Sequence, residues 1–175
     1  MNHADHVRLI RDGVAGAGAA WADLGSGEGA FTLALAELLG PGGSIHTIDR
    51  DRGALDVQLR RLEAAYPEVR VTPIVADFTA AIELPPLDGI VMANSLHFVR
   101  DKAPVLDLVR GYLRPGGRLV LVEYGADHGN QYVPWPLSYA TWATVAAVAG
   151  FRDTRQLTTV PSRFLGSIYS ALSLR

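Results

Sequence analysis

The residues best suited to chemistry form a glycine-rich segment, Asp23-Leu24-Gly25-Ser26-Gly27-Glu28-Gly29, between a short apolar run and a helical pattern. Glycines let the backbone turn sharply and let a ligand approach it closely. The helix expected next would point free N–H groups at the same place, which favours a carboxylate or phosphate. Asp49 lies 24 residues after Gly25, where a carboxylate can accept hydrogen bonds from both hydroxyls of a ribose. The same glycines, with Ala30 last, also satisfy a dinucleotide-binding pattern, so this spacing alone leaves the ligand open.

His97 is the best candidate for a titratable functional group. The ordinary pKa of histidine lies close to neutrality, so an imidazole here could remove a proton from a hydroxyl or an amine. The alternative is a histidine that packs beside a bound molecule or helps to start a helix. The remaining histidines show no metal-ligand spacing, and no bound metal is expected; they are His3, His6, His46 and His128.

Composition restricts the class of protein. The chain has 175 residues, of which 49% are hydrophobic and 19% charged, as expected for one globular domain over residues 1–175. With 16 basic and 18 acidic residues the net charge is −2, which disfavours a general nucleic-acid binder. The absence of cysteine excludes disulfides, thiolate metal sites and a cysteine nucleophile. No run of 18 apolar residues is present for a membrane span, and the early charges at Asp5, Arg8, Arg11 and Asp12 disfavour a signal peptide. The expected location is therefore the cytoplasm.

Strands and helices alternate along most of the chain. This order predicts a parallel sheet with helices on both faces. The last two strands have a short link and must pair antiparallel. The expected fold is therefore α/β, a single doubly wound, mostly parallel seven-stranded sheet with an antiparallel C-terminal strand. The predicted strands are 19–24, 44–49, 69–75, 88–94, 118–124, 152–160 and 167–174, and the predicted helices are 7–14, 30–39, 53–66, 103–113 and 137–149, with a turn at 114–117.

Further segments follow the glycine-rich one in a fixed order. They are Ala76-Asp77-Phe78, Leu87 to Phe98, the Pro-Gly-Gly turn before the strand that ends near Glu123, and Ala149-Gly150-Phe151. With the acid that precedes Gly-x-Gly-x-Gly and with Asp49, they resemble the motifs of the class I S-adenosylmethionine-dependent methyltransferases of small-molecule type. The resemblance covers most of the chain and implies the Rossmann-like methyltransferase fold with S-adenosylmethionine as cofactor. A nicotinamide-dependent enzyme would explain the glycines but neither the Pro-Gly-Gly turn nor the antiparallel ending.

The resemblance also implies roles for individual residues. Asp23 would lie near the amino group of the methionine part, or would cap a helix or a turn. Arg50 would lie against the adenine, or in solvent, while Asp77 would accept the exocyclic amine. Phe78 would pack beside the ring, or belong to the core. The full set of implied cofactor-binding residues is Asp23, Gly25, Ser26, Gly27, Gly29, Asp49, Arg50, Asp77, Phe78, Asn94 and Ser95; the last two are placed where cofactor and substrate should meet, or cap the next turn.

The function implied is methyl transfer to a small organic acceptor. The aromatic-rich segment 124–136 could cover such an acceptor, or could simply pack on the domain. Methylation of adenine N6 is disfavoured because Asn94 is followed by Ser-Leu-His rather than by Pro-Pro-Tyr. RNA or protein methylation stays open and would require a basic face. A cofactor-binding domain without transferase activity is the other alternative.

Overall fold

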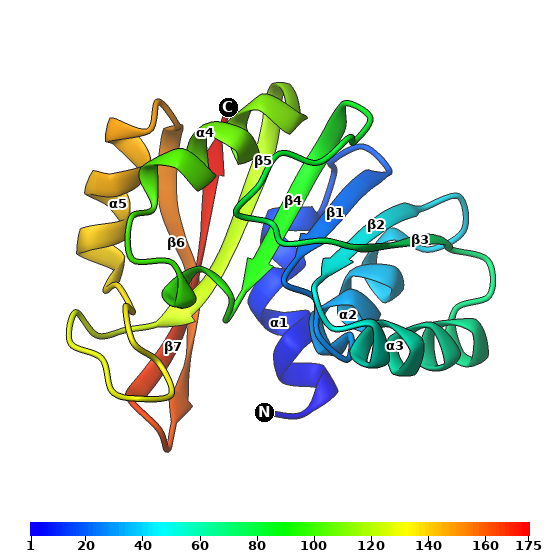
Figure 1. Cartoon of the computed structure of the whole chain (residues 1–175), viewed down its shortest axis with the longest axis horizontal. Helices are drawn as coiled ribbons and strands as arrows, with labels where there is room; N and C mark the ends of the chain where they lie inside the picture. Colours follow the sequence, from blue (N-terminus) through cyan, green and yellow to red (C-terminus); the bar gives the residue numbers. More distant parts are fainter.

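The computed structural model describes residues 1–175 as one seven-stranded sheet flanked by helices (Figure 1). The strand order is β3-β2-β1-β4-β5-β7-β6. The strands are β1 (Ala20–Leu24), β2 (Ser44–Asp49), β3 (Arg70–Val75), β4 (Leu87–Ala93), β5 (Leu113–Tyr124), β6 (Arg152–Ser162) and β7 (Gly166–Leu174). The helices are α1 (His3–Val14), α2 (Ala30–Leu39), α3 (Arg52–Ala65), α4 (Ala103–Tyr112) and α5 (Tyr139–Val148), with a 3-10 turn, η1 (Leu96–Phe98).

The sheet is parallel except for β7, which confirms the predicted fold. β1 pairs in parallel with both β2 and β4, and β4 pairs in parallel with β5. β7 runs antiparallel to its neighbours β5 and β6. In this register Tyr124, the last residue of β5, lies opposite Ile168 near the start of β7. The turn between β6 and β7 therefore extends past the carboxyl ends of the parallel strands, at the lower edge of Figure 1.

Each face of the sheet carries its own apolar core. On one face, Leu9 and Ile10 of α1 and Leu35 of α2 pack with Trp21 of β1, all fully buried. On the other face, α4 and α5 cover the sheet, with Trp142 of α5 fully buried. The first helix is fixed by a capping box, in which the Asn2 side chain accepts from the Asp5 N–H at 2.9 Å and Asp5 accepts from Asn2. The predicted helices on both faces are confirmed.

The connection from β3 to β4 contains no helix. Residues 76–86 cross the face of the sheet as an extended segment, and Ile82 and Leu84 pack against the core of that face. The strand order places β3 at the edge of the sheet, and its Pro73 is tolerated there because a proline removes a ladder hydrogen bond that a central strand needs. No helix in the structure has the length and apolar composition needed to cross a bilayer.

Element boundaries differ from prediction where side chains cap helices or the sheet is irregular. α3 begins at Arg52, one residue before the predicted start, because the Asp51 side chain accepts from the Ala54 N–H at 3.1 Å. α5 begins two residues later than predicted, after its cap Ser138. The Pro-Gly-Gly segment, predicted as a turn before the strand, lies within β5. Leu113 already pairs with Leu87, and the register shifts before Arg118 pairs with Gly89.

Candidate active site

A cleft of about 350 Å³ opens at the carboxyl ends of the first four strands. The strand order reverses between β1 and β4, and in open parallel sheets ligands bind at such a switch point. The cleft brings together seven of the eleven predicted cofactor-binding residues: Gly25, Asp49, Arg50, Asp77, Phe78, Asn94 and Ser95. Its volume lies at the low end of the roughly 300–1,000 Å³ of small-molecule sites.

Gly25 leaves the cleft floor free of side-chain atoms. Its φ of +78° lies in the left-handed region, which disfavours a residue with a Cβ. A Cβ built there would lie 2.5 Å from Cβ of Ser95 and 3.2 Å from Cε1 of Phe78. Ser95 is itself held, because its hydroxyl donates to the Leu24 carbonyl at 2.7 Å. That bond ties the end of β4 to the end of β1, and the Ser95 side chain does not cap the η1 turn that follows, which was the alternative role.

Asp49 is held in position by backbone N–H groups from two sides. Its Oδ2 accepts from Gly27 N–H at 2.8 Å, and its Oδ1 accepts from Asp51 N–H at 2.9 Å. A carboxylate has about four acceptor positions, so each oxygen can accept again. The arrangement leaves Asp49 able to bind two vicinal hydroxyls.

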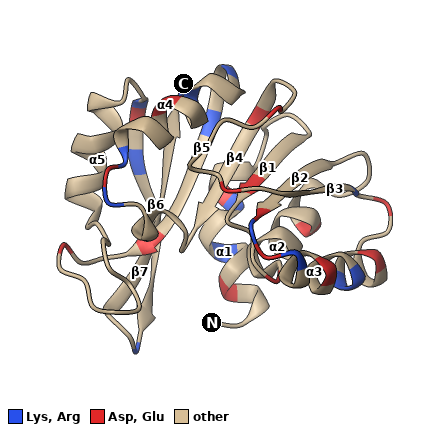
Figure 2. Cartoon of the chain, in the orientation of Figure 1, with Lys and Arg blue, Asp and Glu red and all other residues tan.

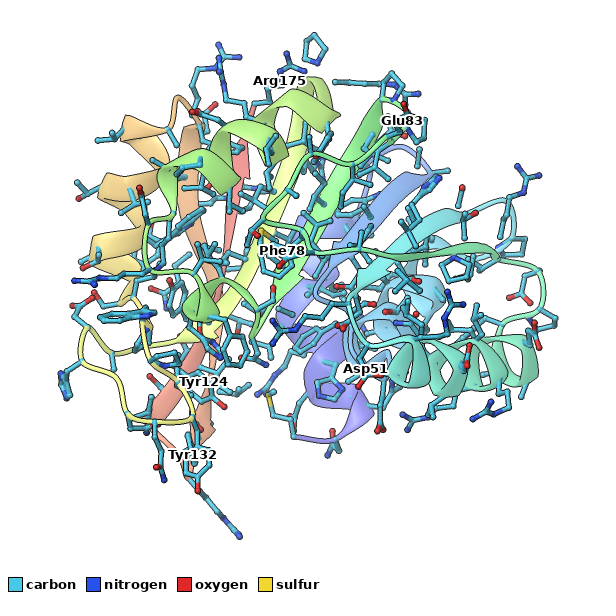
Figure 3. All side chains as sticks on the ribbon, viewed as in Figure 1. Asp51, Phe78, Glu83, Tyr124, Tyr132 and Arg175 are labelled. Carbon is cyan, nitrogen blue, oxygen red and sulfur yellow. The ribbon has the colours of Figure 1, made fainter.

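Arg50, Asp77 and Phe78 form the outer part of the cleft. The Thr79 hydroxyl and N–H both donate to Oδ1 of Asp77, at 2.7 and 2.9 Å, which lowers the pKa of this carboxyl and leaves Oδ2 free. Phe78 is partly buried; it packs against the core and also lines the cleft, where packing beside an adenine ring stays a prediction. It lies on the segment that crosses the sheet in Figure 3. The Arg50 side chain is exposed at the rim.

Four of the predicted residues do not line the cleft. Gly29 is the N-cap of α2 and has a φ of +85°. A Cβ at this position would lie 2.5 Å from Cγ of Gln58, so the absence of a side chain lets α3 pack closely against the start of α2. Gly27 contributes the N–H that holds Asp49, and Ser26 is buried. Asp23 is buried at the end of β1, where its Oδ2 accepts from the Thr32 hydroxyl at 2.6 Å. Burial, opposed by this bond and reinforced by Asp49, raises the pKa of Asp23 to about 7.

His97 forms a buried pair with Glu123, which ends the apolar run of β5. The ring Nδ1 lies 2.9 and 3.0 Å from the two oxygens of Glu123, and the two side chains are 3% and 0% exposed. Glu123 also accepts from the N–H groups of His97, at 3.1 Å, and Tyr124, at 2.8 Å. A carboxylate acceptor makes Nδ1 the protonated nitrogen, so the lone pair resides on Nε2.

A second cavity, of about 360 Å³, adjoins the cleft on the side of His97. The two cavities share Asn94 and Phe98 in their walls. Asn94 has a left-handed φ of +53°, and its side-chain oxygen Oδ1 is buried without a hydrogen-bond partner. Tyr124 and Tyr132, at the lower end of the sheet in Figure 3, lie on the far side of this cavity.

Sequence reasoning did not assign roles to Glu123 or Phe164. Glu123 carried a signal, because an acid directly after the apolar run Leu-Val-Leu-Val lies near the carboxyl end of a buried strand, where ligands bind. Phe164 carried none, since only the register of β7 brings the turn between β6 and β7 to Tyr124, with ring centroids 6.0 Å apart. No group of three or more possible metal ligands is present.

The sequence profile of a family described as a methyltransferase domain matches residues 22–119, more than half of the chain. The chain belongs to this methyltransferase family. No curated protein matches the sequence. Membership of this family shows that the chain is an enzyme. The family, the fold and the cleft all support S-adenosylmethionine as its cofactor.

Solved structures show the same fold at low identity. A SAM-dependent methyltransferase from Aquifex aeolicus is 18% identical, with a TM-score of 0.68 over 88% of this chain and 80% of that one. The methyltransferase SibL in its apo form is 23% identical, with a TM-score of 0.66 over 86% and 49%. The N-terminal domain of EvdMO1, solved in the presence of SAH (S-adenosylhomocysteine) and D-fucose, is 21% identical, with a TM-score of 0.73 over 99% of this chain and 83% of that one. The chain thus spans about half of SibL and most of the other two.

Three observations indicate that the residues of the cleft fit this cofactor. A side chain at Gly25 would fill the space against Ser95, so the loop is built for close approach of a ligand. Asp49 keeps acceptor capacity for a ribose, and Asp77 keeps a free oxygen for an amine. The unpartnered Oδ1 of Asn94 provides a buried acceptor beside the second cavity.

Proposed function

We propose that the chain transfers the methyl group of S-adenosylmethionine to a small organic acceptor, and that His97 removes a proton from that acceptor. The observation that carries the proposal is the common wall of the two cavities, made by Asn94 and Phe98. A donor in the cleft and an acceptor beside His97 are then neighbours. Holding two reactants in this way accounts for much of the rate that such a reaction needs.

Residues of the cleft divide the binding of the cofactor between them. Asp49 would accept from the ribose hydroxyls, and Asp77 from the adenine amine. Asn94 would accept from the ammonium of the methionine part. Asp23 lies behind the loop and does not line the cleft, and it would supply a negative charge when the nearby ammonium favours its ionised form. When bound, S-adenosylmethionine supplies a methyl group on a positively charged sulfur, so positioning is the main task left to the protein.

His97 is the one histidine positioned to act as a general base. Glu123 fixes the ring through Nδ1, and Nε2 has no partner in the chain while the ring lines the second cavity. A base held in this way by a buried carboxylate is the arrangement that activates hydroxyl nucleophiles in many enzymes. Once Nε2 takes a proton, the charge of Glu123 stabilises the resulting imidazolium at 2.9 Å.

The size and charge of the site favour a small acceptor over RNA or protein. The second cavity has the volume of a compact organic molecule. Arg60 and Arg61 on α3 are interspersed with Asp56 and Glu63, so acidic and basic bands alternate along that helix in Figure 2. Salt-dependent RNA binding would need basic side chains gathered on one surface.

Label transfer distinguishes the alternatives. The chain is incubated with methyl-labelled S-adenosylmethionine and with the small-molecule, RNA and protein fractions of a cell extract. The proposal expects label in the small-molecule fraction, and loss of that label in His97→Asn while calorimetry shows unchanged SAH binding. Label in RNA or protein, or SAH binding without any transfer, would contradict it in favour of the two alternatives.

A further inference from the structure

The walls of the second cavity are unusually aromatic for a surface pocket. Phe98, Tyr132 and Phe164 are 62%, 63% and 47% exposed. They come from η1, from the loop after β5 and from the turn between β6 and β7, yet all three line this one cavity. Large apolar side chains that gather in one exposed place mark a binding site more often than chance exposure does.

The rings form a continuous series around the cavity. The His97 and Phe98 centroids are 4.3 Å apart, and those of His97 and Tyr124 are 5.8 Å apart. Phe164 then lies 6.0 Å from Tyr124 and 5.8 Å from Tyr132. The wall rings therefore contact one another as tilted and edge-to-face pairs, and a planar ring bound against them would join the same aromatic cluster.

The cavity contains no cationic side chain to hold an anionic acceptor. Its polar members are Asn94, His97 and the hydroxyls of Tyr124 and Tyr132. The buried charge of Glu123 is taken up by His97 and by two backbone N–H groups. An additional anion would lie near the negatively charged Glu123 with no cationic partner among the residues of the cavity, which favours an uncharged acceptor.

The position of His97 in the wall of the cavity indicates which functional group of the acceptor reacts. An uncharged amine nitrogen has a free electron pair and can attack without losing a proton first. A hydroxyl gains nucleophilicity when a base accepts its proton during the reaction. A histidine fixed by a buried carboxylate is therefore suited to a hydroxyl acceptor.

We propose that the second cavity binds a neutral, planar aromatic compound and presents its hydroxyl group to Nε2 of His97. The inference rests on the proposed function and specifies its substrate class. The hydroxyl proton passes to Nε2 while the oxygen's electron pair forms the bond to the methyl carbon. The electron pair of the broken carbon–sulfur bond stays on sulfur, so the products are an aryl methyl ether and SAH. His97 then releases its proton to water.

A larger cavity adjoins this position. It has a volume of about 650 Å³ and shares Tyr124 and Phe164 with the second cavity. Its other walls come from the start of the chain, Met1, Asn2 and Asp5, and from Arg163. Phe164 thus lines both cavities and contacts two rings of the second one, which makes it the residue to test.

The test compares a flat ring with a saturated one of the same skeleton. Binding of 2-naphthol and of decahydro-2-naphthol is measured by calorimetry on the SAH complex of the full chain. We expect 2-naphthol to bind at least about 5-fold more tightly, and Phe164→Ala to remove about 3- to 10-fold of its affinity, in keeping with the loss of one aromatic pair. Val148→Ala serves as the matched control, because Val148 is an 84% exposed apolar residue outside this cavity.

Each outcome bears on one claim. Equal affinity for the two compounds, or equal effects of Phe164→Ala and Val148→Ala, would overturn the inference. If SAH itself does not bind, the proposed function fails. If SAH and 2-naphthol bind in this pattern but no 2-methoxynaphthalene forms from S-adenosylmethionine, the aromatic site stands and methyl transfer to a hydroxyl is wrong.

Discussion

Replacing Asp23 by asparagine should stabilise the free protein at neutral and alkaline pH. Asp23 is 1% exposed, and burial raises its pKa from 3.8 to about 7, with the Thr32 hydrogen bond opposing and Asp49 adding to the shift. Between these values the folded state holds a proton that the unfolded state has released. Stability therefore falls as pH rises through this window and stays low above pH 7.

The expected magnitude follows from the two pKa values. At about 1.4 kcal/mol for each tenfold change, the full shift corresponds to about 4 kcal/mol, of which about 2–3 kcal/mol develops between about pH 5 and pH 7. Asparagine keeps the shape and can accept from the Thr32 hydroxyl, which in turn accepts from the Gln58 amide at 2.8 Å. The variant should thus gain stability without losing this buried chain of hydrogen bonds.

Urea unfolding of parent and Asp23→Asn at several pH values between about 5 and 8 measures the effect. The difference in unfolding free energy between the two proteins should grow with pH in favour of the variant. In a separate calorimetric titration, the variant should bind SAH about 10-fold or more weakly, because it lacks the charge that Asp23 provides for the ammonium. The comparison cancels other titrating groups, such as His6 and His46, whose pKa values burial lowers. A difference that does not change with pH would refute the reasoning.

Two further substitutions follow from the geometry. Gly25→Ala should cost about 1–3 kcal/mol of stability and most of the SAH affinity, because its Cβ would lie 2.5 Å from that of Ser95. Gly27→Ala is the control, since Gly27 also has a positive φ but no atom lies within 4 Å of the added Cβ. If the two variants lose equal stability in urea unfolding and equal SAH affinity in calorimetry, close approach of the ligand at Gly25 is contradicted. Glu123→Gln should lower kcat about 100-fold or more, with little change in KM for S-adenosylmethionine, and should alter the pH profile of kcat. The reason is that the variant loses the charge that orients and stabilises the His97 ring. A changed KM with an unchanged kcat would assign Glu123 a purely structural role.

Local signals in the sequence predicted the cleft well. The glycine segment and Asp49 lie at the ends of neighbouring parallel strands, so their position follows from the order of elements alone. The second cavity depends on contacts between distant parts of the chain. Phe164 reaches Tyr124 only through the antiparallel register of β7, which no short motif encodes.

Other features depend on packing rather than on pattern. The pKa of Asp23 results from complete burial against α2, whereas Asp49, with the same side chain, remains at the cleft. The Pro-Gly-Gly segment has the composition of a turn, but the pairing of Leu113 with Leu87 places it within a strand. Tertiary contacts override local preference in both cases.

Calorimetric titration of SAH into the parent and into Asp49→Ala tests the central claim most directly, with Asp56→Ala, an exposed acid on α3, as the matched control. Binding by the parent and by Asp56→Ala, together with a loss of about 10- to 100-fold in Asp49→Ala, is the predicted result for a charged acceptor that holds a ribose. Unchanged affinity in Asp49→Ala, or no binding by the parent, would contradict the account.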